Sequence, residues 1–224
     1  MRHKITLIAI FSILLFQSCS SVKVVNAWKA DQEDIANFKK RNILVIARTN
    51  NEQSRIAFEM EIANQLRAKG FKATESYSKA PQLNKAEMTE ERVAFIRELM
   101  GYEGLDGVVI TVVKDKQQTT TTTSNGVFFG ASYSNFYPGY YGSFYNYYSY
   151  PYAYGSYYDS FGGYIPTGTS TRTNTKYVLE TVAYNLNASN EDQIVAVVTT
   201  DLDDPKDAFK TAKKYVDEMM KALE

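Results

Sequence analysis

The hydrophobic and polar positions of this 224-residue chain predict strands and helices on either side of a polar, aromatic segment. Residues 43–46 are a continuous apolar run, which is typical of a strand covered on both faces. The chain then predicts a helix that starts at an N-cap, Asn50, and ends before Gly70. Helical spacing relates its apolar positions Phe58, Ile62 and Leu66.

The pattern continues through two further elements and a strong strand. Residues 71–77 predict a second, weaker strand, and Thr89 opens a second helix that ends at Gly101. Residues 105–113 include a run in which every side chain is β-branched. Because β-branched residues fit a pleated sheet well, this run predicts the strongest strand of the chain.

A strand pair and a helix are predicted in the last 50 residues. Residues 176–186 alternate between apolar and polar positions, residues 189–192 have the composition of a hairpin turn, and residues 194–199 predict the return strand. The final helix should be capped by Asp204, with Pro205 at its first position. Its apolar face would comprise Phe209, Ala212, Tyr215, Val216, Met219 and Met220.

These elements predict an α+β fold, in which helices pack on a mixed sheet of about five strands. The expected order is β-α-β-α-β, an insertion, then β-β-α. Residues 42–224 would form a single domain, with the insertion at residues 117–171. Residues 19–41 would tether this domain, although residues 20–34 also fit a lead-in strand.

The first 18 residues have the organisation of a signal peptide. Residues 2–4 form a positive n-region, and residues 5–16 form an apolar segment of 12 residues. A membrane-spanning helix needs roughly 20 apolar residues, so we expect this segment to be removed. Cys19, the only cysteine, follows Ser18 directly.

This arrangement resembles bacterial lipoprotein signals, in which a small residue precedes the cysteine that becomes the acylated amino terminus. The resemblance implies a signal peptide over residues 1–18 and a lipid on Cys19 that anchors the chain in a membrane. Residues 16–17 depart from the side chains that are commoner there. The serines at 20–21 favour the outer membrane, facing the periplasm, in families with a known sorting rule. The alternative is an ordinary secretory signal followed by a free thiol.

Charge and histidine content exclude several functions. Removing residues 1–18 leaves 23 basic and 25 acidic side chains, a balance that does not favour nucleic-acid binding. His3 is the only histidine and would be removed with the signal. Nucleophiles activated by histidine and zinc sites with histidine ligands are therefore excluded. We expect a protein that is not an enzyme and that uses neither metal nor cofactor.

Two local motifs do not fit a ligand site. Residues 201–204 space their carboxylates as a calcium loop does, but Lys206 replaces the turn glycine and Ala212 replaces the bidentate glutamate. The turn at residues 48–51 has no glycine that would let backbone amides approach a phosphate. We interpret the first motif as a strand-to-helix turn and exclude nucleotide binding of the P-loop kind.

The insertion at residues 117–171 is unlike the rest of the chain. It contains one charged residue, Asp159, and 13 of the 18 tyrosines. Tyrosine supplies amphipathic contact area with few rotatable bonds, which suits adhesive surfaces and stacking on sugars. The composition also fits a surface loop without a defined partner. The candidate interaction residues are Tyr140, Tyr141, Tyr145, Tyr147, Tyr148, Tyr150, Tyr152, Tyr154, Tyr157 and Tyr158.

The order of elements supports a second resemblance. A glycine-led third strand, a variable hairpin, a strand that ends in Asn185-Leu186-Asn187 and the polar turn at 189–192 resemble the small periplasmic domain of the curli secretion-channel lipoprotein. The pattern is also similar to the amino-terminal domain of the Tol-system propeller protein. The resemblance covers residues 43–223 and implies a mixed-sheet domain of the cell envelope.

The sequence therefore predicts a lipid-anchored envelope protein that acts as an interaction or assembly module. Its partner would be another copy of itself, an envelope protein or cell-wall glycan. One alternative is a subunit of an oligomeric outer-membrane secretion channel, but residues 117–125 and 167–175 are polar on both faces, unlike a membrane-crossing strand. The other alternative is an envelope enzyme. If the insertion is only a surface element, deleting residues 126–167 should leave the domain folded.

Overall fold

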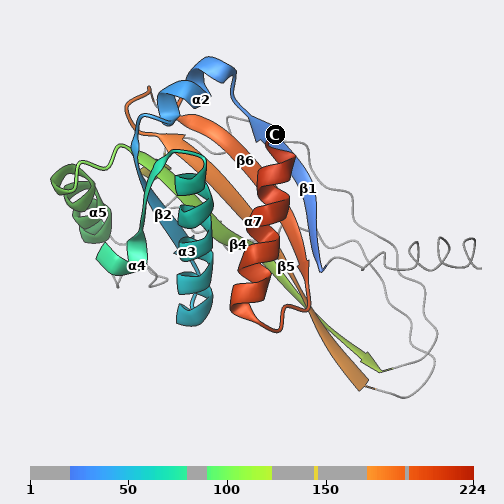
Figure 1. The fold of residues 1–224 in the computed structure, drawn as a ribbon. Helices are drawn as coiled ribbons and strands as arrows, with labels where there is room; N and C mark the ends of the chain where they lie inside the picture. Colours follow the sequence, from blue (N-terminus) through green and yellow to red (C-terminus); the bar gives the residue numbers. More distant parts are fainter. Residues whose placement is uncertain (1–20, 80–89, 123–143, 146–170, 190–191) are drawn as a thin grey trace, which may run out of the picture.

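The computed structural model describes residues 21–79, 90–122, 144–145, 171–189 and 192–224. In this part of the chain, six strands form one mixed sheet in the order β1-β6-β5-β4-β2-β3, and five helices surround it (Figure 1). The α+β class and the mixed sheet predicted from the sequence are confirmed.

The sheet is parallel at one edge and antiparallel over the rest. Strand β2 runs parallel to both β3 and β4, whereas β4, β5, β6 and β1 pair antiparallel in turn. The strands are β1 (Val22–Lys29), β2 (Asn42–Arg48), β3 (Lys72–Glu75), β4 (Gly107–Thr122), β5 (Thr171–Asn185) and β6 (Ile194–Asp203). The helices are α2 (Gln32–Phe38), α3 (Glu52–Ala68), α4 (Ser76–Lys79), α5 (Glu90–Tyr102) and α7 (Ala208–Ala222).

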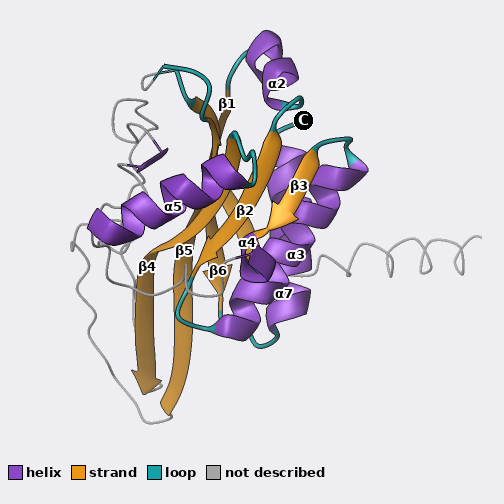
Figure 2. Cartoon of the chain, turned by 90° about the vertical axis from the view of Figure 1, so that its left-hand side faces the viewer, coloured by secondary structure: helices purple, strands orange, loops and turns teal. Residues whose placement is uncertain are grey.

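Helices α3 and α7 cover one face of the sheet, and α5 covers the other (Figure 2). Successive side chains of a strand point to opposite faces, so β2 contributes to two cores. Ile43 and Val45 belong to the core beneath α3 and α7, whereas Leu44 and Ile46 belong to the core that contains Ile96 of α5. The apolar run of β2 is therefore covered on both faces, as its sequence predicted.

Helices α3 and α5 lie within about one residue of their predicted bounds, whereas α4 was not predicted. Asn51, rather than Asn50, caps α3, because its side chain accepts a hydrogen bond from Ser54 N at 2.8 Å. The predicted strand over 71–77 is shorter, since α4 begins at Ser76. None of the helices in the described part of the chain has both the length and the apolar character needed to span a bilayer.

The predicted start of the last helix is wrong. Asp207, rather than Asp204, caps α7 by accepting a hydrogen bond from Lys210 N at 2.8 Å. Asp204 instead adopts a positive φ of 46° in the turn that follows β6. Phe209, which we expected on the apolar face, lies in the first turn before the buried stripe and is 44% exposed.

The segment before residue 42 is an integral part of the sheet. β1 pairs with β6 from Val22↔Leu202 to Lys29↔Ala196, and α2 connects it to β2. The lead-in strand is therefore correct for this segment, and a tether that extends to residue 41 is wrong. The physical reason is burial, because Val22 and Phe38 belong to the main core.

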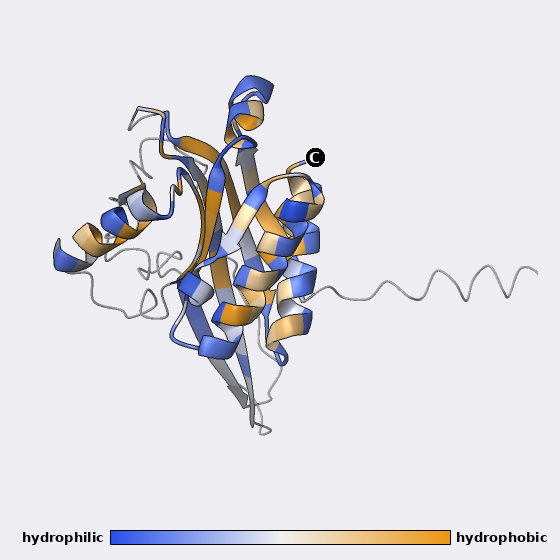
Figure 3. Ribbon diagram, turned by 60° about the vertical axis from the view of Figure 1, so that its left-hand side comes forward, coloured by the Kyte–Doolittle hydropathy of each residue, from blue (hydrophilic) through white to orange (hydrophobic). Residues whose placement is uncertain are grey.

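Strands β4 and β5 continue past the sheet as a two-stranded ribbon (Figure 1). β2 stops pairing with β4 at Val112 and β6 stops pairing with β5 at Lys176, but the β4–β5 ladder continues to Thr122↔Thr171. Residues 117–122, which we assigned to the insertion, are therefore strand, as the high β-propensity of threonine favours. Figure 3 shows hydrophilic colours along this ribbon.

Candidate functional site

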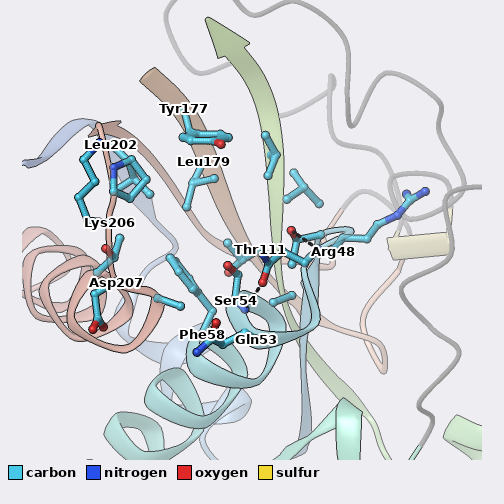
Figure 4. A pocket seen from close by; sticks show the side chains of 18 residues that line it. Arg48, Gln53, Ser54, Phe58, Thr111, Tyr177, Leu179, Leu202, Lys206 and Asp207 are labelled. Carbon is cyan, nitrogen blue, oxygen red and sulfur yellow. Dashed lines mark hydrogen bonds between the residues drawn. The ribbon is translucent and has the colours of Figure 1, made fainter. Parts of the chain in front are cut away.

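A cleft of about 290 Å³ opens where the N-termini of α3 and α7 meet the carboxyl ends of β2 and β6. Figure 4 shows side chains from the two helix starts, from the loops before them and from β4 and β5 around this space. Ligands of α/β sheets commonly bind at the carboxyl ends of strands, so this cleft is the best candidate site. Its polar lining residues are Arg48, Thr49, Asn51, Gln53, Ser54, Thr111, Tyr177, Lys206, Asp207 and Thr211.

The helix N-termini at the cleft are capped by the chain itself. Asn51 Oδ1 accepts a hydrogen bond from Ser54 N, and Asn51 N donates to Thr49 Oγ1 at 3.2 Å. At α7, Asp207 Oδ1 accepts from Lys210 N. Uncapped helix N-termini attract anions, but here a side-chain oxygen already accepts a hydrogen bond from one backbone N–H of each helix. The two caps therefore weaken the attraction of these helix starts for a phosphate.

The basic groups near the cleft are directed elsewhere. The side chain of Arg48, the last residue of β2, runs away from the cleft in Figure 4 and is buried. Lys206 Nζ lies 2.7 Å from Asp204 Oδ1. Among the lining residues that the structure describes, Asp207 has the only carboxylate, and its Oδ1 serves as the cap of α7.

A chain of buried hydroxyl groups supports the floor of the cleft. Thr111 Oγ1 and Thr181 Oγ1 are 2.7 Å apart, and Thr181 Oγ1 is 2.6 Å from Tyr215 Oη. Burial raises the pKa of Tyr215 above its ordinary value, so the phenol stays protonated and can donate within this chain. The Tyr215 ring packs against Phe58 with ring centroids 5.2 Å apart. These contacts hold the floor in one arrangement.

The lining of the cleft is mostly uncharged. Among the described residues it combines hydroxyl and amide groups with apolar floor residues, and its charged members are Arg48, Lys206 and Asp207. Over the described ranges, no three potential metal ligands of the His, Cys, Asp or Glu type lie together.

The sequence did not point to this cleft, because its residues are ordinary for strand-to-helix loops. The order of elements is the signal that could have located the cleft. One helix follows β2 and another follows β6, and both run back along the same face, so both start at the same end of the sheet.

Tyr145 is the one residue predicted from the sequence for an interaction surface that lies in the described part of the chain. Tyr145 is partly buried on the α5 face, with its ring centroid 5.0 Å from that of Phe144 and 4.8 Å from Arg97 Cζ. Phe144 is fully buried there. Outside the described residues lie Cys19, Tyr140, Tyr141, Tyr147, Tyr148, Tyr150, Tyr152, Tyr154, Tyr157 and Tyr158.

No protein-family profile matches the chain, and no curated protein matches it either. Among solved structures, a point variant of PelC from Paraburkholderia phytofirmans, a dodecamer, aligns with a TM-score of 0.38 and 11% sequence identity. That alignment covers 92% of this chain and 99% of the PelC chain. A second PelC dodecamer from the same organism aligns with a TM-score of 0.37 and 9% identity, over 90% of this chain and 95% of the other. Similarities of this size do not identify the protein.

Proposed function

We propose that this chain is a lipid-anchored protein of the bacterial cell envelope that holds an interaction arm beside the membrane and catalyses no reaction. The arm consists of the β4–β5 ribbon and the tyrosine-rich sequence that connects its two strands. The anchor rests on the signal-like residues 1–18 and on Cys19, the only cysteine.

One geometric observation supports an arm beside the membrane. Ser21 lies at the base of the ribbon, because its carbonyl oxygen accepts a hydrogen bond from Asp203 N at 2.8 Å and Asp203 pairs with Lys176 of β5. Cys19 is two residues earlier, and two residues of chain span at most about 7 Å. A lipid on Cys19 would therefore hold the ribbon end of the sheet, rather than the opposite end, at the membrane surface.

The ribbon has features that suit contact with a partner. Beyond Val112 of β4 and Lys176 of β5, the outer edges of the ribbon have no strand partner among the described residues. Such edges offer backbone donors and acceptors to another chain. The connecting sequence adds tyrosine rings with almost no charge, which favours self-association and stacking on sugars. The partner is therefore a second copy of the chain or cell-wall glycan.

Replacing Cys19 with alanine should move most of the protein from the membrane fraction to the soluble periplasmic fraction, because the chain has no other cysteine to acylate. Cell fractionation with immunoblotting measures this change, and gradient separation of the membranes should place the wild type in the outer membrane. Ser21→Ala is the matched control and should stay membrane-bound. Retention of Cys19→Ala in the membrane at the wild-type level would contradict the anchor.

The interaction arm has its own test on the mature chain, residues 19–224 with Cys19→Ser. Serine replacements in the tyrosine tract should abolish concentration-dependent sedimentation or peptidoglycan pull-down while leaving the fold intact. Tyr145 is left unchanged because it packs beside Phe144, and Tyr102→Ser is the control, since Tyr102 is 87% exposed elsewhere. A monomeric wild type that retains no peptidoglycan would overturn this part of the proposal. The residues to replace are Tyr147, Tyr148, Tyr150, Tyr152 and Tyr154.

A further inference from the structure

A second cavity, of about 360 Å³, lies at the opposite end of the α3–α7 layer from the cleft. The sheet forms its floor, the C-terminal halves of α3 and α7 form its walls, and α2 contributes to its mouth. Ala183 of β5 and Ala196 of β6 both lie in the floor and are direct partners in the β5–β6 ladder. Both side chains are single methyl groups, and larger side chains at these two positions would fill the cavity.

The lining of this cavity is mostly apolar, and part of it is exposed to solvent. Ile35, Phe71, Met220 and Leu223 pack against the main core but are only partly buried. A concave apolar site of this volume falls in the range of small-molecule pockets, roughly 300–1,000 Å³. The space fits a flexible hydrocarbon chain and is too small for a second protein domain.

Three lysines surround the mouth. Lys69 Nζ lies 3.0 Å from Glu224 Oε1, and Lys29 Nζ donates a hydrogen bond to the main-chain oxygen of Glu224 at 2.9 Å. Lys39 Nζ lies 5.7 Å from the centroid of the Phe71 ring. All three lysines line the cavity, and among the described residues of its lining Glu224 is the only acidic one.

The lysines at the mouth already hold carboxylates. In a chain that ends at Glu224, both the side-chain carboxylate and the terminal carboxylate of this residue lie against the ammonium groups. The C-termini of α3 and α7 each carry about half a negative charge, so the mouth is close to neutral with Glu224 in place, and roughly two positive charges remain once a ligand displaces this residue. The contact between Lys69 and Glu224 also demonstrates that this rim accommodates a carboxylate.

We propose that this cavity binds a long-chain fatty acid. Its carboxylate would lie between Lys39 and Lys69 in place of the Glu224 side chain, and its hydrocarbon chain would cover Ala183 and Ala196. The inference is independent of the lipid anchor, because Cys19 precedes the start of β1 and the cavity lies at its end. Eight residues of strand, roughly 25 Å, separate the two.

The test is a fluorescence titration of the mature chain, residues 19–224 with Cys19→Ser, with cis-parinaric acid below its aggregation concentration. This form contains every described residue. We expect saturable binding of one molecule per chain. Lys39→Gln combined with Lys69→Gln should weaken it about five- to tenfold, since each exposed ion pair contributes modestly. Lys40→Gln, whose lysine is adjacent but bonded to Asn37, should change nothing.

Two further variants separately test where the hydrocarbon chain and the carboxylate of the fatty acid bind. Ala196→Leu should weaken binding at least about tenfold because leucine fills the hollow, and circular dichroism will verify that this variant keeps its fold. Glu224→Gln should strengthen binding about two- to threefold, because it removes one of the competing carboxylates. The mature chain should also bind the methyl ester of the same acid at least about fivefold more weakly.

Each opposite result would overturn the proposal. Equal affinity for the acid and its methyl ester, or for a zwitterionic lysophospholipid, would rule out carboxylate recognition. Binding that is unchanged in both Ala196→Leu and the double lysine variant would place the ligand elsewhere. Absence of saturable binding would leave no fatty-acid site in this cavity. None of these outcomes depends on where the protein resides in the cell, so they are separable from the tests of the anchor.

Discussion

Replacing Glu59 with leucine should lower the free energy of unfolding by about 3–5 kcal/mol, a large fraction of the stability of a domain of this size. Glu59 is fully buried in α3 and joins three elements. Its Oε1 accepts hydrogen bonds from Ala47 N at 3.0 Å, Arg55 Nε at 3.1 Å and Ser76 Oγ at 2.7 Å, and its Oε2 accepts from Tyr77 N at 2.7 Å.

The Glu59 carboxylate accepts a backbone hydrogen bond at the end of the sheet. The β2–β3 ladder ends at Val45↔Glu75, so Ala47 lies beyond it and its N–H donates to Glu59 instead. Burial raises the pKa of Glu59 and the donors around it act in the opposite direction. Leucine would leave these donors without their acceptor, and it would remove the nearest carboxylate from the fully buried Arg55.

Urea unfolding of the mature chain, followed by circular dichroism, measures the effect. Glu59→Gln should cost less, about 1–3 kcal/mol, because its oxygen can replace Oε1 while its amide would face the N–H of Tyr77. Arg55→Leu combined with Glu59→Leu should recover part of the loss, because the buried cation is removed with its partner. Glu61→Gln on the same helix is the control and should change stability by less than about 0.5 kcal/mol. An unchanged unfolding midpoint for Glu59→Leu would show that the network contributes nothing.

Replacing Phe144 with alanine should also cost about 3–5 kcal/mol, as expected for a large aromatic side chain removed from a core. Phe144 is completely buried on the α5 face, where its ring centroid lies 5.8 Å from that of Tyr184. Its N–H donates to Gln193 Oε1 at 3.2 Å. Thermal unfolding of the mature chain provides the measurement. Phe95→Ala is the matched control, because Phe95 of α5 is 50% exposed and should lose far less.

The position of Phe144 changes the expectation for the insertion. We expected that deleting residues 126–167 would leave the domain folded, but this deletion removes Phe144 and Tyr145 from the second core. The deletion should therefore destabilise the domain about as much as Phe144→Ala does, or more. A melting midpoint equal to that of the wild type, in both variants, would show that the α5 face does not need these rings.

Composition and local pattern were sufficient for the framework, because they depend on neighbours in the chain. The apolar run at 43–46 and the β-branched run at 108–113 form strands, and the segment in which Phe58, Ile62 and Leu66 recur at helical spacing forms α3. The helix starts were less well predicted. Asn50 and Asn51, or Asp204 and Asp207, are equivalent as capping residues in sequence, and only the backbone geometry distinguishes them.

Local sequence is enough to establish the α+β class, the sheet-forming and helix-forming segments and the unusual composition of the insertion, because hydrophobic periodicity and residue type are local properties. The contacts between distant segments are evident only in the folded chain. There β1 pairs with β6, Phe144 meets Gln193 across 49 residues, Ala183 lies beside Ala196, and α3 and α7 start at the same end of the sheet. These pairings follow from strand order and register, which are set by burial over the whole sheet and not by the spacing of any single segment.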